Sequence, residues 1–181
     1  KKGVNNNGDS YNNFYPLVDA VNNPDTATYA AGVHAVSDVR SWADHFAFRR
    51  VSGDWDGYGF NRGKNTFIYR PTGGKWIMLP WDMDFSLGAS SRATDQDLFT
   101  EINDPVLNNQ WFAEPEFTRA YWQSLYAFAT GPMEAAGFDS ESDAWYGVFQ
   151  SYGVSSAGPA SMQTWVRDRR AFILQEFTAE D

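Results

Sequence analysis

One segment of this chain, residues 53–88, holds polar side chains whose types and spacing suit a divalent metal ion beside a phosphate group. Carboxylates stand before and after two short apolar runs, with amide and basic side chains in between. The set comprises Asp54, Asp56, Asn61, Arg62, Lys64, Asn65, Asp82 and Asp84. Hard oxygen donors bind Mg²⁺, and cationic side chains bind phosphate. The segment therefore predicts metal and phosphate chemistry, and no other part of the sequence is as specific.

Asp82 and Asp84 flank Met83 at the end of the second apolar run. If a strand continues through them, its alternation puts both carboxylates on the same side. Two neighbouring carboxylates repel each other unless a cation or protons separate them, which favours a metal site. The other interpretation is that one Asp caps the following turn while the other is solvated. The residues alone do not separate these two interpretations.

The earlier carboxylates, Asp54 and Asp56, stand among glycines that favour turns, so both are open to a simple interpretation as loop residues. In a phosphoryl transferase, Asp56 would instead orient the acceptor hydroxyl or share a metal. Their spacing also resembles the start of a Ca²⁺-binding loop. Asn65 stands at the twelfth position from Asp54, where an EF-hand has a Glu, and such a loop is therefore not favoured.

The basic side chains of the segment, Arg62 and Lys64, have two interpretations. They contact a phosphate, or they balance the charge of the surrounding carboxylates. The second interpretation is the simpler one, because four Asp residues lie in the same segment.

Most of the elements that must position this segment are expected to be helical. Periodic apolar residues and capping residues predict helices over 14–21, 26–35, 116–129, 142–150 and 160–177, together with a helix that Ser37 caps and that leads to Gly53. Strands are expected over 65–70 and 75–81, joined by a tight turn at 71–74. Residues 89–109 are expected to be irregular. The pattern predicts an α+β fold, mainly helical around one small β-hairpin.

Composition narrows the class of protein. A length of 181 residues with 17% aromatic residues predicts one globular domain and argues against disorder. No Cys is present, which excludes disulfides and Cys-ligated zinc, and no apolar run is long enough to span a membrane. The net charge of −9, concentrated after residue 100, argues against nucleic acid as a partner. Motifs of Ser hydrolases, P-loop proteins and dinucleotide-binding proteins are absent, and His34 and His45 are interpreted as ordinary helix residues.

The segment resembles the core of the CotH kinase-like family, first known from bacterial spore coats. The resemblance rests on Asp56, on Asn65 before the aromatic strand 66–69, and on a second strand that ends in the sequence Pro-Trp-Asp-Met-Asp at 80–84. It implies a protein-kinase-like fold that binds ATP and Mg²⁺ and transfers phosphate to a protein acceptor. The implied catalytic residues are Asp56 and Asp82, the implied metal ligands are Asp82, Asn65 and Asp84, and the implied cofactor-binding residues are Asn65, Arg62 and Lys64. Ca²⁺ stays open as an alternative ion.

The resemblance also sets an expectation for the whole chain. It implies that residues 1–181 form a single kinase-like C-terminal lobe, with residues 1–13 irregular. A kinase also needs an N-terminal lobe with a phosphate-covering loop and a nucleotide-pairing Lys, and no such strand-rich lobe precedes the helices. We therefore expect this piece to be inactive until an N-lobe segment completes it. The alternative is a non-catalytic bacterial surface or interaction module that keeps the fold. The acidic, Cys-free composition indicates a secreted or cell-surface location.

Overall fold

The structure is a computed structural model that describes residues 11–60, 63–99 and 107–178. Its elements follow one another as α1 (Tyr15–Val21), α2 (Thr26–Val36), α3 (Val39–Val51), β1 (Thr66–Tyr69), β2 (Ile77–Pro80), a π-helical turn η1 (Leu107–Trp111), α4 (Pro115–Ala129), α5 (Ala135–Ser151) and α6 (Ala160–Thr178). The mainly helical α+β class predicted from the sequence is confirmed.

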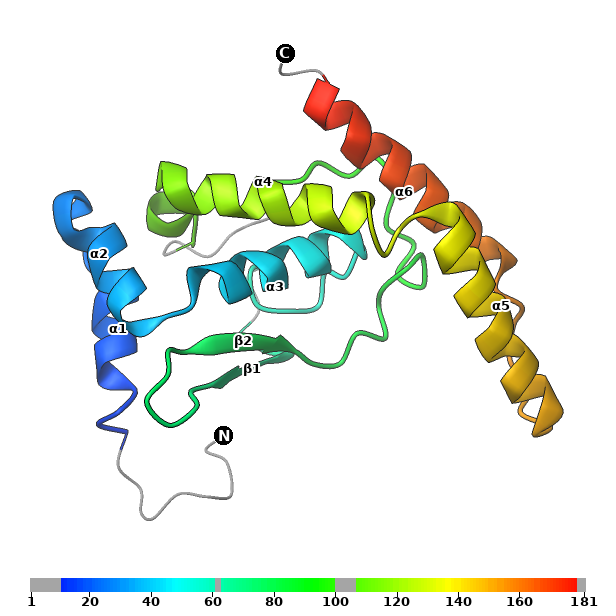
Figure 1. Ribbon diagram of the computed structural model, residues 1–181, viewed down its shortest axis with the longest axis horizontal. Helices are drawn as coiled ribbons and strands as arrows, with labels where there is room; N and C mark the ends of the chain where they lie inside the picture. The colour runs from blue at the N-terminus through cyan, green and yellow to red at the C-terminus, as the bar shows by residue number, and fades with distance from the viewer. Residues whose placement is uncertain (1–10, 61–62, 100–106, 179–181) are drawn as a thin grey trace.

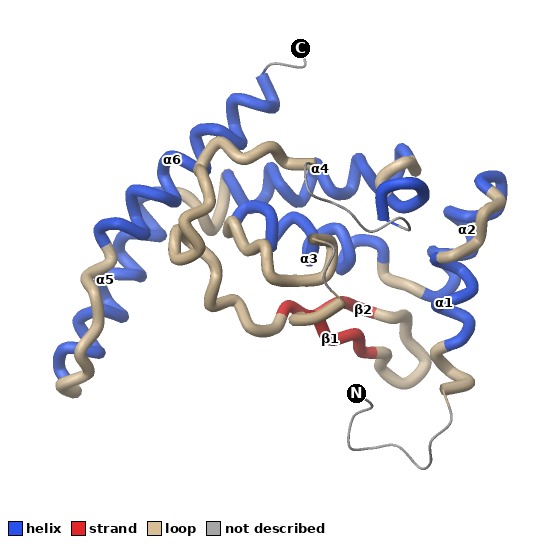
Figure 2. Tube along the Cα trace, turned by 180° about the vertical axis from the view of Figure 1, so that it is seen from behind, coloured by secondary structure: helices blue, strands red, loops and turns tan. Residues whose placement is uncertain are grey.

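Helix α3 is the centre of the molecule. It lies between α4 and the β-hairpin, with α1 and α2 at one end of this stack and the long pair α5 and α6 at the other (Figure 1). The same arrangement is seen from behind in Figure 2. Side chains on every side of α3 are buried, among them Val39, Trp42 and Phe46. A helix buried all round is typical of a core element, and α3 therefore carries its last residues, Arg49 and Arg50, into the interior.

The start of α3 is fixed against the hairpin. Asp38, and not Ser37, caps this helix, because its carboxylate accepts a hydrogen bond from the Ser41 backbone N–H at 3.0 Å. The prediction that Ser37 caps α3 is therefore wrong. Ser37 ends α2 in an extended conformation, where it forms a bridge with Trp76 just before β2. The hydroxyl of Ser37 donates back to the Val33 carbonyl at 2.7 Å, which closes α2 instead of opening α3.

The two strands pair antiparallel, and the register places Thr66 opposite Pro80 and Tyr69 opposite Ile77. The predicted turn is present: the Gly74 backbone N–H donates to the Pro71 carbonyl at 2.9 Å, and Gly73 has a φ of 72°, which glycine adopts without strain. Met78 and Ile68 lie opposite each other in the middle of the hairpin. Met78 is buried and Ile68 is partly buried. The neighbouring outward side chains are large, apolar and exposed: Phe67, Tyr69, Leu79 and, just after β2, Trp81.

Helices α5 and α6 form a paired arm at one end of the molecule (Figure 1). Helix α5 is longer than the predicted 142–150 and has no buried residue. Its contacts to α6 include polar ones, since the Gln163 amide donates to Ser142 and to Asp143, both at 2.9 Å. A sequence pattern of buried apolar residues could not reveal a helix held in this way. None of the helices among the described residues combines the length and the apolar character needed to cross a membrane.

Candidate functional site

The chain between α3 and the hairpin wraps around one buried side chain, Arg49. The guanidinium group of Arg49 donates hydrogen bonds to the Asp54 carboxylate, to the Asn65 backbone carbonyl and, at 3.1 Å, to the Trp81 carbonyl. Asn65 directly precedes β1 and Trp81 directly follows β2. A single side chain from α3 therefore joins both open ends of the hairpin to the loop that holds the first pair of carboxylates.

Asp56 and Asn65, which the sequence analysis assigned to one site, lie in contact. The Asn65 amide nitrogen donates to the Asp56 backbone carbonyl at 2.6 Å and to its carboxylate at 3.3 Å. The ammonium group of Lys64 lies 2.7 Å from the same carboxylate, and Asp56 is buried. Lys64 balances charge in this structure, as in the simpler of its two interpretations. Because the amide nitrogen faces Asp56, the amide oxygen of Asn65 is left without a donor among the described residues.

Asp82 and Asp84 lie beyond the end of the hairpin. Strand β2 ends at Pro80, and Asp82 has a φ of 56°, so alternation along a continuing strand does not place the two carboxylates on one side. The condition for that arrangement, a strand that continues through Asp82, is therefore not met. Both side chains are exposed, and neither has a hydrogen-bond or ion-pair partner in the described part of the chain. Asp82 interacts electrostatically with Arg49.

Positive φ angles occur at two of the three expected metal ligands. Asn65 has a φ of 57° and Asp82 a φ of 56°, values that L-residues adopt at a cost of roughly 1–3 kcal/mol, although Asn and Asp tolerate them better than most. The two positions are tied together, since the Trp81 backbone N–H donates to the Asn65 carbonyl at 3.0 Å. Backbone strain of this kind clusters at functional sites because the surrounding contacts hold it in place.

Asp54 and Arg49 form an ion pair whose side chains are no more than 1% exposed. Burial raises the pKa of the Asp54 carboxyl, and the guanidinium beside it opposes that rise. Burial likewise lowers the pKa of Arg49. The negative charges of Asp54, Asp56 and Asp82 oppose that fall. Asp54 is thus the internal partner of Arg49, and its carboxylate is occupied. The cations expected from the sequence are Arg62 and Lys64, and Arg49 is not among them. Arg62 lies outside the described residues.

His45 is a second residue whose role the sequence analysis missed. Its Nε2 accepts a hydrogen bond from the Arg49 Nε at 3.3 Å and lies 3.2 Å from the Thr66 hydroxyl oxygen. Burial, reinforced by the positive charge of Arg49, lowers the pKa of His45 to about 3. The ring is therefore neutral at physiological pH and supports Arg49 as an acceptor. The i, i+4 spacing of His45 and Arg49 on one helix was the available signal.

The donor set fits a metal that is shared with a phosphate ligand. No three His, Asp or Glu side chains within the described residues are arranged to hold a metal ion by themselves. Mg²⁺ in nucleotide sites is commonly held by one or two carboxylates together with phosphate and water oxygens. The Asp82 carboxylate and the Asn65 amide oxygen would supply the protein's share of such a site, with Asp84 two residues further along the chain. Sequence and geometry are thus compatible with Mg²⁺ bound through a nucleotide.

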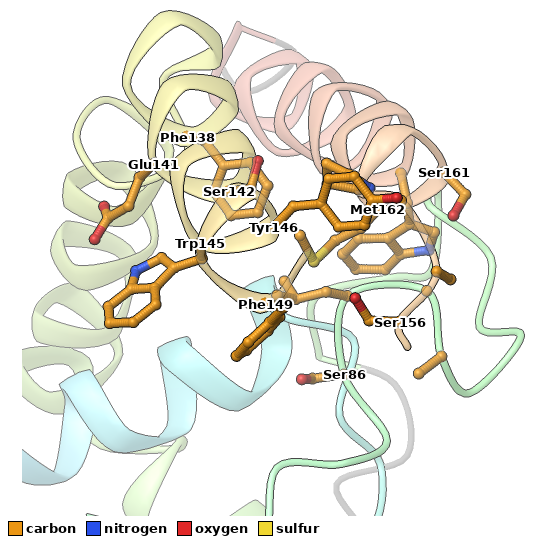
Figure 3. Close-up of a pocket in the computed structure, with 17 residues that line it drawn as sticks. Ser86, Phe138, Glu141, Ser142, Trp145, Tyr146, Phe149, Ser156, Ser161 and Met162 are labelled. Atoms are coloured by element: carbon orange, nitrogen blue, oxygen red, sulfur yellow. The ribbon is translucent and has the colours of Figure 1, made fainter. Parts of the chain in front are cut away.

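A separate cleft of about 660 Å³ opens between α5, α6 and the loop that follows Asp84. Trp145, Tyr146 and Phe149 of α5 and Met162 of α6 line it, with Ser86 from the loop (Figure 3). Its lining includes one carboxylate, Glu141, and no basic side chain or histidine. An apolar cleft without a cation does not suit nucleotide phosphates, so the chemistry is expected at the hairpin and not here.

Comparisons with known proteins bear on the whole chain. The family model described as CotH kinase protein matches residues 1–173, nearly the full length. Searches of curated proteins and of solved structures gave no significant match. The matched range includes Asp56, Asn65, the hairpin and the residues after it up to Asp84, which carried the resemblance. This chain therefore belongs to the CotH kinase family.

Proposed function

We propose that this chain is the metal-binding lobe of an ATP- and Mg²⁺-dependent protein kinase, which transfers the γ-phosphate of ATP to a hydroxyl group on a protein acceptor. One observation carries the proposal: the contacts of Arg49 bring a buried carboxylate at Asp56, an amide oxygen at Asn65 and an exposed carboxylate at Asp82 around the same end of the hairpin. Membership of the family supports a kinase-like protein.

Asp82 and Asn65 have the donor atoms for the metal role. The side chain of Asp82 is exposed and has no hydrogen-bond or ion-pair partner among the described residues, so its oxygens are available to a cation. Asn65 uses its amide nitrogen on Asp56, and its amide oxygen has no hydrogen-bond donor among the described residues. Mg²⁺ held by these two side chains would offset negative charge on the transferred phosphate. Asp84 is the second carboxylate that would complete this side of the site.

Asp56 suits the role of the group that orients the acceptor. In the proposed reaction, the acceptor oxygen forms a bond to the γ-phosphorus, the bond from that phosphorus to the β–γ bridging oxygen breaks, and the hydroxyl proton passes to the Asp56 carboxylate. Lys64 and Asn65 both bind that carboxylate, and they would keep it in one orientation. Positioning of this kind accounts for much of catalysis in phosphoryl transfer, because the chemistry needs little covalent help from the protein.

The outer face of the hairpin supports a further body next to the site. Its exposed side chains are Phe67, Tyr69, Leu79 and Trp81, and the last directly precedes Asp82. Contiguous exposed apolar side chains mark interaction surfaces. The proposal places the nucleotide-clamping part of a kinase over this face, with the acceptor protein on the side of Asp56. A secreted or cell-surface location is part of the same proposal and rests on composition alone.

The decisive test is a calorimetric titration of the full-length protein with ATP, with Mg²⁺ and with Mg²⁺ removed by EDTA. We expect ATP binding that depends on Mg²⁺, and phosphate transfer from ATP to the protein itself or to an added acceptor. A non-catalytic module would not transfer phosphate. ATP binding that EDTA leaves unchanged, or no binding, together with no phosphate transfer, would overturn the proposal.

A further inference from the structure

We infer that Arg49 is a positioning residue of this site: its guanidinium holds the backbone at Asn65 and next to Asp82 in the positive-φ conformation from which both side chains reach a metal ion. The metal part of this inference rests on the proposed function. Arg49 itself is 0% exposed, so it touches neither substrate nor solvent and acts only through its neighbours.

The contacts of Arg49 explain why an arginine is needed. One nitrogen, Nη2, donates to the carbonyls of both Asn65 and Trp81, while Nη1 pairs with Asp54 and Nε donates to His45. The planar fork of a guanidinium satisfies several acceptors at fixed angles, whereas a Lys ammonium is a single point charge. Arg49→Lys would keep the charge and lose the simultaneous hold on both carbonyls.

Gly57 supplies a second way to disturb the same guanidinium. A Cβ at this position would lie 2.0 Å from Nη1 of Arg49 and 2.3 Å from its Cζ. Gly57→Ala therefore forces the guanidinium to move, although no charge or hydrogen-bonding group is removed. Gly63, in the same loop, is the matched control, because a Cβ there meets no atom within 4 Å.

Arg169 of α6 is the matched control for Arg49. It is 1% exposed and also donates to backbone carbonyls, those of Thr94 at 3.0 Å, Arg50 at 3.0 Å and Gln96. None of these carbonyls belongs to a candidate ligand. Arg169→Lys should therefore lower stability without changing the site, and it separates loss of positioning from loss of packing.

The experiment uses the 181-residue chain and two readouts. The first is the backbone ¹³C chemical shifts of Asn65 and Asp82 without metal, which report φ and ψ. The second is the affinity for Mn²⁺, measured by water-proton relaxation. In Arg49→Lys and Gly57→Ala we expect the positive-φ shifts to be lost and Mn²⁺ affinity to fall about 10-fold or more, the range for groups that orient metal ligands. Arg169→Lys and Gly63→Ala should keep both.

The outcomes separate this inference from the proposed function. Folded Arg49→Lys or Gly57→Ala protein with wild-type shifts at Asn65 and Asp82 would overturn the positioning role. If the shifts move but wild-type protein binds no Mn²⁺, the metal function fails and the structural role of Arg49 stands. If Arg49→Lys does not fold, Gly57→Ala decides, since it retains both the arginine and Asp54 and displaces only the guanidinium.

Discussion

Two buried arginines hold two irregular parts of this molecule, and they differ in what surrounds them. Arg49 holds the loop before β1 and the chain after β2, while Arg169 holds the chain around residues 94–96. Both bind backbone carbonyls in the interior. Arg49 also has a buried carboxylate partner, Asp54, whereas Arg169 has no ion pair among the described residues and donates its hydrogen bonds there to carbonyls. Burial lowers the pKa of both arginines, and with the nearby charge of Arg50 it lowers the pKa of Arg169 to about 10.

The difference shows that a buried arginine is a general structural device in this chain and does not by itself mark a site. A carbonyl that needs a donor inside the protein can be satisfied by a guanidinium wherever the backbone is irregular. The features that distinguish the region of Arg49 are its ion pair with Asp54 and the positive φ of Asn65, whose carbonyl it binds, and of Asp82, which follows the bound carbonyl of Trp81. These features combine charge with a fixed backbone, as metal and phosphate chemistry require.

The largest expected effect is on phosphoryl transfer, and it comes from Asp82, the exposed carboxylate near Arg49. Asp82→Asn should reduce phosphoryl transfer by the full-length protein by more than about 100-fold, because a neutral amide cannot replace the charge of a metal ligand. Asp95, which interacts electrostatically with Arg169, is the matched control, and Asp95→Asn should leave activity unchanged. The fold of both variants is checked by circular dichroism. Autophosphorylation at the wild-type rate in Asp82→Asn would contradict the assignment of Asp82.

Breaking the ion pair between Arg49 and Asp54 tests another difference between the two arginines, because Arg169 has no such partner among the described residues. Asp54→Ala leaves the buried charge of Arg49 without its counter-ion and should lower the free energy of unfolding by about 3–5 kcal/mol. The double variant Arg49→Met/Asp54→Ala should be less destabilised than the sum of the two single variants, since neither charge is left alone. Chemical denaturation of the four proteins measures this cycle. Strict additivity would mean that the pair is not coupled.

A smaller effect is expected from the pH dependence of His45. Its pKa is about 3 in the folded protein and near 6.5 when unfolded, so the unfolded state binds more protons between these values and stability falls as the pH drops below 6.5. From pH 7 to pH 5, this group should cost about 2 kcal/mol of stability. Denaturation of wild type and of His45→Gln at both pH values isolates the contribution of His45 to the pH dependence of stability. Between pH 7 and pH 8 the free energy of unfolding should change equally in the two proteins. Equal losses of stability at pH 5 would contradict the lowered pKa of His45.

The smallest expected effect on stability concerns Lys64. Its side chain is 52% exposed where it pairs with Asp56, and solvent weakens such pairs, so Lys64→Ala should change the free energy of unfolding by less than about 1 kcal/mol. Lys75→Ala, at an exposed Lys in the hairpin turn region, is the control for general loss of charge. A much larger loss in Lys64→Ala alone would show that the loop at Asp56 depends on this lysine as strongly as on Arg49.

Local sequence patterns predicted most elements, while the chemistry they indicate for the segment stays a prediction. Helix α1, strand β1, strand β2 and the turn at Gly73 depend on apolar periodicity and on turn-forming residues, which act over a few positions. The carboxylates and amides of residues 53–88 indicated a metal beside a phosphate because their donor atoms are a property of residue type. Helix α5 was predicted too short, since polar contacts to α6 contribute to holding it.

Only the tertiary structure decided which cation organises the site and where the second strand ends. The bonds of Arg49 reach Asn65 and Trp81, which lie 16 and 32 positions further along the chain, and no local pattern encodes such a contact. Strand β2 ends at Pro80 because the next residues turn with a positive φ at Asp82, while Trp81 is held by Arg49 and Asn65. The ligand types follow from the sequence, whereas their geometry follows from a buried charge that must find acceptors wherever folding brings them.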